Sequence, residues 1–178
     1  NLPALAHLTC VNHTRAQVGE LLAKIRALGC QNILALRGDP PGGTGEFQKT
    51  EGGFEFSYQL VKLLRELGGF SIGVAGFPEG HIACREGKQV DWQRLKHKID
   101  CGADFVVTQL FFDNADFYEF RDYLTRLGVK VPIVPGIMPV LSLRQIQSFA
   151  TMCGTALPSE LRAQLEAAGD DVAAAETV

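Results

Sequence analysis

The sequence lacks the features of a membrane, secreted or nucleic-acid-binding protein. No apolar run approaches the roughly 20 residues that cross a bilayer, and the chain opens with Asn-Leu-Pro-Ala-Leu-Ala rather than a basic signal region. The net charge is only −3 at pH 7, and the lysines and arginines are scattered rather than gathered into a stripe. The five cysteines form no C-x-x-C pair, which disfavours a disulfide framework or a zinc site. We therefore expect a cytoplasmic protein that binds neither membrane nor nucleic acid.

Several catalytic motifs are also absent. The four histidines have no H-E-x-x-H or comparable spacing, so no metal is expected. No G-x-S-x-G elbow is present, and no cysteine has a local activating motif, so nucleophilic catalysis has little support. These absences favour chemistry carried by a bound cofactor.

What the sequence does contain is a repeat of about 30 residues, the size of one βα unit. Short apolar runs that suit buried parallel strands alternate with helical stripes, and a Leu-Gly or Cys-Gly pair after each of four stripes predicts a helix end. Thr14 and Gln17 predict a capping box before the first helix. The predicted strands are Leu5 to Thr9, Asn32 to Leu36, Ile72 to Gly76, Phe105 to Phe111 and Ile133 to Ile137.

Two α/β architectures accommodate five such units: an open doubly wound sheet, or part of an eight-unit barrel. Residues that could bind a ligand stand at the end of every predicted strand. A barrel has its site at the carboxyl ends of all its strands, whereas an open sheet concentrates its site at one switch point. We therefore predict a partial (β/α)8 TIM barrel. These groups are Cys10, Arg37 to Asp39, Phe77 to His81, Gln109 with Asp113, and Met138 with Pro139.

Three segments are the strongest candidates for chemistry. Residues 35–45 run from a strand into a glycine and proline loop that is neither a P-loop nor a Rossmann fingerprint, so a flexible turn with an Arg-Asp ion pair is the alternative. Residues 74–81 end in His81, and a histidine in a loop is often structural. Gln109 interrupts an apolar run, where its amide must bind either other side chains or a ligand.

Taken in order, five segments resemble the methylenetetrahydrofolate reductase family, and the match runs over essentially the whole chain. The segments are His7-Leu-Thr-Cys10, Ala35-Leu-Arg-Gly-Asp39, Val74-Ala-Gly-Phe-Pro-Glu-Gly-His81, Gly102-Ala-Asp-Phe-Val-Val-Thr-Gln-Leu-Phe-Phe112 and Val134-Pro-Gly-Ile-Met-Pro139. The resemblance implies an eight-stranded barrel that holds FAD at its carboxyl-end face, with these units as the third to seventh strands. It also implies that NADH or NADPH reduces the flavin, which then reduces methylenetetrahydrofolate to methyltetrahydrofolate for methionine synthesis.

The resemblance further implies roles for particular residues. Asp39 is implied to lie near both the flavin ring and the folate, where its charge would disfavour an anionic flavin and favour a cationic substrate; we expect it to be catalytic as well as ligand-binding. Gln109 matches the amide that contacts the folate and the nicotinamide in turn. The implied flavin-binding residues are His7, Arg37, Gly38, Asp39, Phe77, His81, Asp91 and Lys98.

Some positions depart from the family pattern. Phe77 replaces a frequent tyrosine, and Leu143 replaces an aromatic residue of some bacterial members. The general-acid glutamate is expected before Asn1 and the last barrel unit after Val178. Residues 1–178 are therefore predicted to be one catalytic domain truncated at both ends, inactive alone and a homo-oligomer at full length. The alternatives are another barrel flavoenzyme, such as a proline dehydrogenase, and a non-catalytic flavin-binding barrel.

Overall fold

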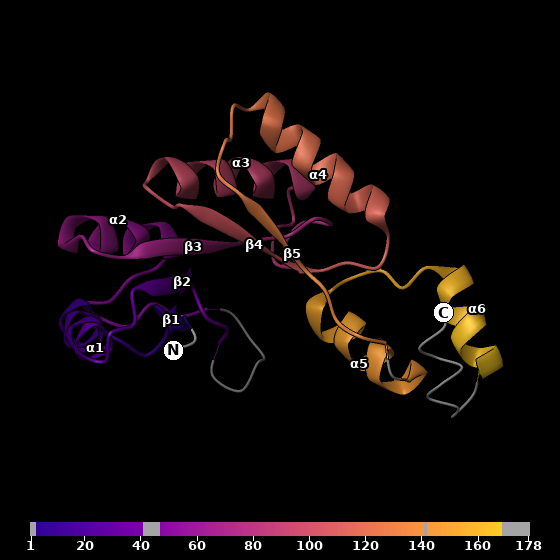
Figure 1. Ribbon diagram of the computed structural model, residues 1–178, viewed down its shortest axis with the longest axis horizontal. Helices are drawn as coiled ribbons and strands as arrows, with labels where there is room; N and C mark the ends of the chain where they lie inside the picture. The colour runs from indigo at the N-terminus through magenta and orange to yellow at the C-terminus, as the bar shows by residue number, and fades with distance from the viewer. Residues whose placement is uncertain (1–2, 41–46, 141, 169–178) are drawn as a thin grey trace. The chain divides into compact units, whose positions relative to one another are not determined.

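In the residues that the computed structural model describes, 3–40, 47–140 and 142–168, one helix follows each of the first four strands and two helices follow the fifth (Figure 1). The prediction of five βα units is confirmed, with strand bounds that shift by only a residue or so. The elements are β1 Leu5–Thr9, α1 Arg15–Ala27, β2 Asn32–Leu36, α2 Ser57–Leu67, β3 Ser71–Gly76, α3 Lys88–Asp100, β4 Phe105–Leu110, α4 Asn114–Arg126, β5 Ile133–Gly136, α5 Leu143–Cys153 and α6 Ser159–Ala168.

The strands pair in the order of the sequence, β1-β2-β3-β4-β5. β1 pairs with β2 and β2 with β3 in parallel; His7 stands beside Leu34, and Ile33 beside Ile72. A doubly wound sheet reverses its order at a switch point, whereas a barrel adds each strand to the same edge. Because parallel crossovers are right-handed, the order β1-β2-β3 places α1 and α2 on one face of the sheet in the first unit.

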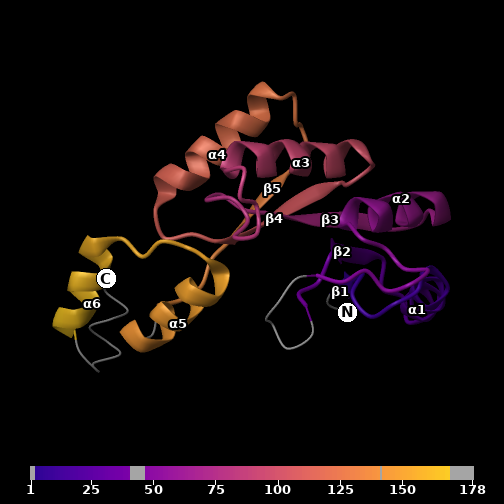
Figure 2. The ribbon, with the colours of Figure 1, turned by 180° about the vertical axis from the view of Figure 1, so that it is seen from behind.

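The chain divides into two compact units. The first comprises Asn1–Ala75 and Arg94–Val106, and the second comprises Gly76–Gln93 and Val107–Val178. In the first unit α1 and α2 accompany β1, β2 and β3, and α2 packs against β2 (Figure 2). Its core is apolar and fully buried, and it includes Val18, Leu22, Ile33, Leu60, Leu64, Ile72 and Val74.

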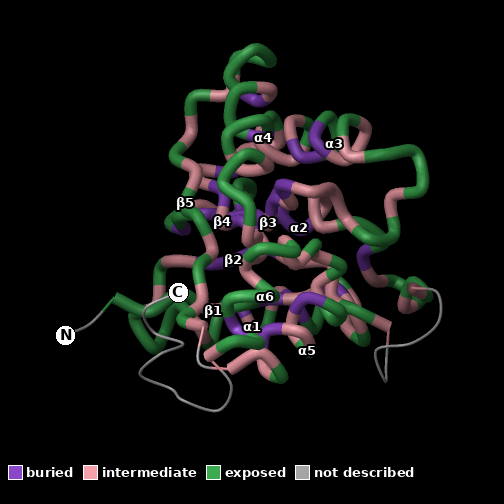
Figure 3. Tube along the Cα trace, turned by 90° about the vertical axis from the view of Figure 1, so that its right-hand side faces the viewer, coloured by how far each residue is buried: buried purple, intermediate pink, exposed green. Residues whose placement is uncertain are grey.

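The core of the second unit is built on aromatic packing and a separate helix pair. Trp92 and Phe120 are fully buried, with ring centroids 5.6 Å apart at an interplanar angle of 69°. Ile146 of α5 and Leu165 of α6 form a smaller buried cluster with apolar residues around them. In Figure 3, buried and partly buried residues recur along the helices between exposed ones.

The helix ends follow the predicted local rules. The Thr14 hydroxyl accepts from the Gln17 amide at 3.2 Å and the Gln17 side chain accepts from the Thr14 amide at 2.9 Å, which is the predicted capping box. The four predicted glycines, Gly29, Gly68, Gly102 and Gly128, all have positive φ. Each helix therefore closes where the glycine allows the left-handed turn.

The prediction that all five strands are buried is wrong for β1 and β5. β1 has exposed residues at Leu5 and His7, and Val134 in β5 is 47% exposed. These two strands lie at the ends of the strand order, so each has a neighbouring strand on one side only. The described part of the chain has no helix of the length and apolarity that a membrane span requires.

Candidate active site

The ends of β1 and β2 are joined through the backbone of Arg37. Its carbonyl accepts from the amides of Cys10 and Val11, both at 3.1 Å. Gly38 follows with a φ of +85°, and a Cβ at this position would lie 2.6 Å from Cγ1 of Val11. Because only glycine tolerates both the backbone angle and the close approach, this residue fixes the path of the chain between Arg37 and Asp39.

The side chains around this turn differ in exposure. Asp39 and His7 are exposed, whereas Arg37 is half-buried with its guanidinium 5.1 Å from the centre of the Phe47 ring. The buried Cys10 thiol donates to the Leu36 carbonyl at 3.3 Å, and burial raises its pKa to about 11, against the opposing effect of Arg37. Cys10 is therefore protonated at neutral pH and has no nucleophilic role here.

Lys98 lies in the last turn of α3 and belongs to the same unit. Its ammonium group donates to the carbonyl oxygen of Ala75 at 2.9 Å, close to the carboxyl end of β3. The contact is half-buried. The structure thus places the Lys98 ammonium group at the carboxyl end of β3, and ligands bind at the carboxyl ends of strands in β/α barrels.

In the second unit the predicted residues Phe77, His81 and Asp91 lie together at the turn that follows β3. The Phe77 carbonyl accepts from Nε1 of Trp92 at 2.8 Å and from the Gly80 amide at 2.9 Å. The rings of Phe77 and His81 pack edge to face, 4.6 Å apart at 82°. One buried indole therefore anchors a turn that presents an aromatic ring and an imidazole.

The His81 ring has a defined hydrogen-bonding state. Its Nδ1 accepts from the Ala83 amide at 3.0 Å, so a neutral imidazole carries its proton on Nε2. The backbone amide of His81 donates to Oδ2 of Asp91 at 3.2 Å. In this structure Asp91 thus holds the His81 turn on α3.

Gln109 lies next to the end of β4, with Oε1 accepting from the amide of Leu110 at 2.9 Å. Beside it, the buried hydroxyl of Thr108 accepts from the Gly136 amide at 2.9 Å. A Cβ at Gly136 would overlap the Thr108 carbonyl oxygen, so β4 and β5 approach closely at this point. Both Gln109 and this close approach stand at the carboxyl ends of their strands.

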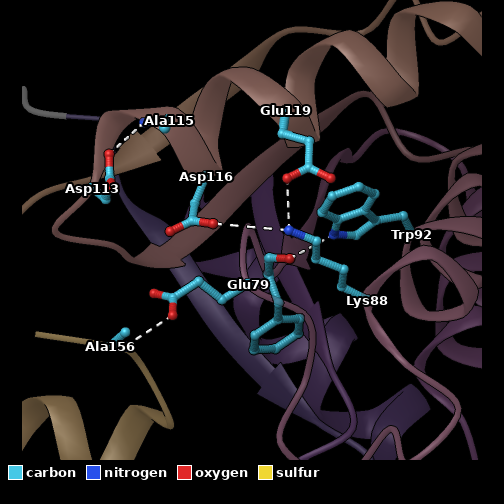
Figure 4. A network of polar contacts seen from close by, with 9 residues as sticks. Glu79, Lys88, Trp92, Asp113, Ala115, Asp116, Glu119 and Ala156 are labelled. Atoms are coloured by element: carbon cyan, nitrogen blue, oxygen red, sulfur yellow. Dashed lines mark hydrogen bonds and ion pairs between the residues drawn. The ribbon is translucent and has the colours of Figure 1, made fainter. Parts of the chain in front are cut away.

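The second unit also contains a charged cluster that the sequence did not indicate (Figure 4). It consists of Glu79, Lys88, Asp116 and Glu119. Lys88 Nζ is 2.6 Å from Oε2 of Glu119 and 3.9 Å from Oδ1 of Asp116. Glu79 directs one oxygen to the amide of Ala156 at 2.8 Å. Glu79 falls within the segment 74–81 that the sequence singled out, but a lone carboxylate between Pro78 and Gly80 gave no sign of its distant partner.

Two carboxylates of this cluster have raised pKa values. Burial is the main cause for Glu79, with Asp116 and Asp113 adding to the rise and the Ala156 amide and Lys88 opposing it. Burial likewise raises the pKa of Asp116, against the opposing charge of Lys88. The cluster therefore contains more negative than positive charge, in partly desolvated surroundings.

Two hollows, of about 360 and 500 Å³, lie elsewhere on the two units, and neither is lined by a predicted site residue. The candidate site is therefore defined by side chains at strand ends. Arg37 to Asp39 follow β2, Phe77 to His81 follow β3, and Gln109 stands at the end of β4. Polar groups at the carboxyl ends of consecutive strands are typical of β/α-barrel proteins.

The chain belongs to the methylenetetrahydrofolate reductase family, whose model matches residues 1–178. The fold of this family is the (β/α)8 barrel, so the five units are part of such a barrel. The chain is 42% identical over 177 residues to methylenetetrahydrofolate reductase (NADH) 1 of Arabidopsis thaliana, covering 94% of this chain and 30% of the relative. It is 40% identical to the 5,10-methylenetetrahydrofolate reductase of Pectobacterium carotovorum, covering 96% of this chain and 55% of the relative.

The chain thus spans between about a third and about half of the length of these relatives. A solved structure of a Clostridium thermocellum protein, described as binding two copies of 5-methyl-5,6,7,8-tetrahydrofolic acid, covers 96% of this chain. The alignment covers 77% of that protein, with a TM-score of 0.49 and 16% identity, a likeness too weak to add to the family assignment.

Proposed function

We propose that this chain is the flavin-binding part of a methylenetetrahydrofolate reductase. In the proposed reaction, bound FAD takes a hydride from NADH or NADPH and passes it to methylenetetrahydrofolate, which becomes methyltetrahydrofolate. The observation that carries the proposal is the family match over residues 1–178 together with the polar groups that end β2, β3 and β4. We assign the protein to the cytoplasm and expect a homo-oligomer at full length.

The side chains of the site suit a flavin dinucleotide. Arg37 and Lys98 supply positive charge for phosphate oxygens, the arginine as a planar fork and the lysine as a point charge. Gly38 lets the turn pass close to Val11, since even one carbon there would meet the valine side chain, and so fixes the backbone between Arg37 and Asp39. The half-buried Phe77 ring offers an apolar face, and His81 and His7 offer ring nitrogens.

Asp39 and Gln109 are the residues we assign to the substrate. The exposed Asp39 follows the Gly38 turn, so its carboxylate can face a bound ligand. A charge about 4 Å away would interact with it by about 4 kcal/mol at an effective dielectric of about 20, which favours positive charge on that ligand. The Gln109 amide can both donate and accept, which suits two ligands that use one pocket in turn.

The test uses the longest natural polypeptide that contains this chain. We expect a purified protein with a flavin absorption spectrum that bleaches with NADH or NADPH and recovers with methylenetetrahydrofolate, forming methyltetrahydrofolate. Bleaching without recovery by the folate would contradict methylenetetrahydrofolate as the substrate. A folded protein without flavin would contradict the proposal and point to a barrel with another role.

The substitution Asp39→Asn probes the substrate half of the reaction. We expect FAD to remain bound and the rate of reoxidation by methylenetetrahydrofolate to fall at least about tenfold, because the amide removes the charge but keeps the shape. Stopped-flow absorbance measures both half-reactions separately. Asp100→Asn, at an exposed position of α3, is the control; an equal loss in both variants would contradict the assignment.

A further inference from the structure

The loop after β3 is fastened to a segment far away in the sequence, residues 154–156, between α5 and α6. Oε2 of Glu79 accepts from the Ala156 amide, which is 77 residues further along the chain. Gly154 lies against Ile82, since a Cβ there would be 3.1 Å from the isoleucine side chain. The Thr155 hydroxyl donates to the Leu110 carbonyl at 3.0 Å, which ties the same segment to the end of β4.

Glu79 makes this connection at an electrostatic cost. Its second oxygen, Oε1, is buried, and it has no hydrogen-bond partner among the described residues. Asp116 and Asp113 repel the carboxylate, while Lys88 and the Ala156 amide attract it. Removing a charge from water without full pairing is unfavourable, so a neutral side chain would suit this place better if stability alone mattered.

The position of Glu79 in the loop gives the connection a consequence for the site. It lies two residues after Phe77 and two residues before His81, whose rings contact each other. A loop released from Ala156 would let both rings shift together, although Trp92 would still hold the Phe77 carbonyl.

We propose that Glu79 is a positioning residue for the flavin site: its carboxylate fastens the loop between β3 and α3 to residues 154–156 and so sets where Phe77 and His81 stand. This inference rests on the proposed function, because the rings matter only if they meet a flavin. The role requires an acceptor oxygen on a side chain as long as that of glutamate, so that it can bind the Ala156 amide. The negative charge of Glu79 is not required.

The experiment distinguishes the effect of the length of the Glu79 side chain from the effect of its charge. It uses the longest natural polypeptide that contains this chain. Glu79→Gln keeps the acceptor at the same distance, Glu79→Asp keeps the charge but shortens the side chain, and Glu79→Ala removes both. Glu160→Ala, at an exposed position in the first turn of α6, is the control. FAD affinity is measured by fluorescence quenching, and hydrogen exchange reports on the Ala156 amide.

We expect the dissociation constant for FAD to rise by about tenfold or more in Glu79→Ala and Glu79→Asp. In Glu79→Gln and the control it should stay within about threefold of the wild type. Exchange at Ala156 should accelerate in the first two variants only. If Glu79→Ala does not fold, the aspartate and glutamine variants carry the comparison.

Three results would overturn the inference. A glutamine variant that binds FAD as weakly as the alanine variant would show that the negative charge of Glu79 is required. Faster exchange at Ala156 with unchanged FAD affinity would show that the fastening does not position the site. A wild-type protein that binds no FAD would overturn the proposed function as well, whereas unchanged exchange in Glu79→Asp would overturn the fastening alone.

Discussion

The turn after β2 and the turn after β3 each carry residues of the predicted site, but they are held in different ways. The Arg37 to Asp39 turn is fixed by backbone hydrogen bonds and by a glycine that fits closely against Val11. The Phe77 to His81 turn is fixed by side chains, through the Trp92 indole and the carboxylates of Asp91 and Glu79. The first turn should therefore fail only when its glycine is replaced, whereas the second should respond to side-chain changes and to pH.

The largest effect is expected for Gly38→Ala. The new Cβ meets Val11 at 2.6 Å and sits on a φ of +85°, so we expect a loss of about 3 kcal/mol in the free energy of unfolding together with weaker FAD binding. Gly29→Ala is a matched control, since its φ is +78° but no atom of the described residues lies within 4 Å of the new Cβ. It should cost about 1 kcal/mol. Denaturant titrations in which both variants lose the same amount would rule out the steric explanation.

A smaller effect is expected for Trp92→Phe. The variant keeps an aromatic ring in the core but loses the hydrogen bond to the Phe77 carbonyl, which still accepts from the Gly80 amide. We expect a loss of about 2 kcal/mol in the free energy of unfolding and a several-fold weaker affinity for FAD. Phe120→Leu disturbs the same aromatic packing without touching that hydrogen bond. Fluorescence titration should show that only Trp92→Phe weakens FAD binding; equal weakening would assign the effect to packing.

The smallest effect is the pH dependence that Glu79 confers. Its pKa is raised in the folded protein, so the folded state holds the proton more tightly than the unfolded chain does. The resulting stability is fully present below the ordinary pKa of 4.5 and is lost as pH rises through the raised value. Glu79→Gln does not titrate, so its stability relative to the wild type should increase from about pH 4 to about pH 7. Urea titrations showing a constant difference would contradict this.

The positions of the strands and of the helix ends could be predicted from the sequence, because the interactions that determine them are local. Apolar runs rich in branched residues located the strands, and Leu-Gly or Cys-Gly pairs located the helix ends, because both signals depend on neighbouring residues. The contact of Glu79 with Ala156 could not be predicted, since it joins residues 77 positions apart. Likewise, Asp91 gave no sequence signal that it would accept the His81 amide. The assignment of these residues to FAD and folate stays a prediction.

The consecutive strand order has a consequence for how the polypeptide is made. A ribosome releases the chain from its amino end, and domains and their parts begin to fold as they emerge. Among the described strands, each of β2 to β5 finds a partner in the strand synthesised just before it, so this pairing need not wait for a segment still to be translated. The 77-residue link from Glu79 to Ala156 is an exception, because it can close only after the segment beyond α5 has emerged. The sheet should therefore be in place during synthesis before the loop after β3 acquires its final position.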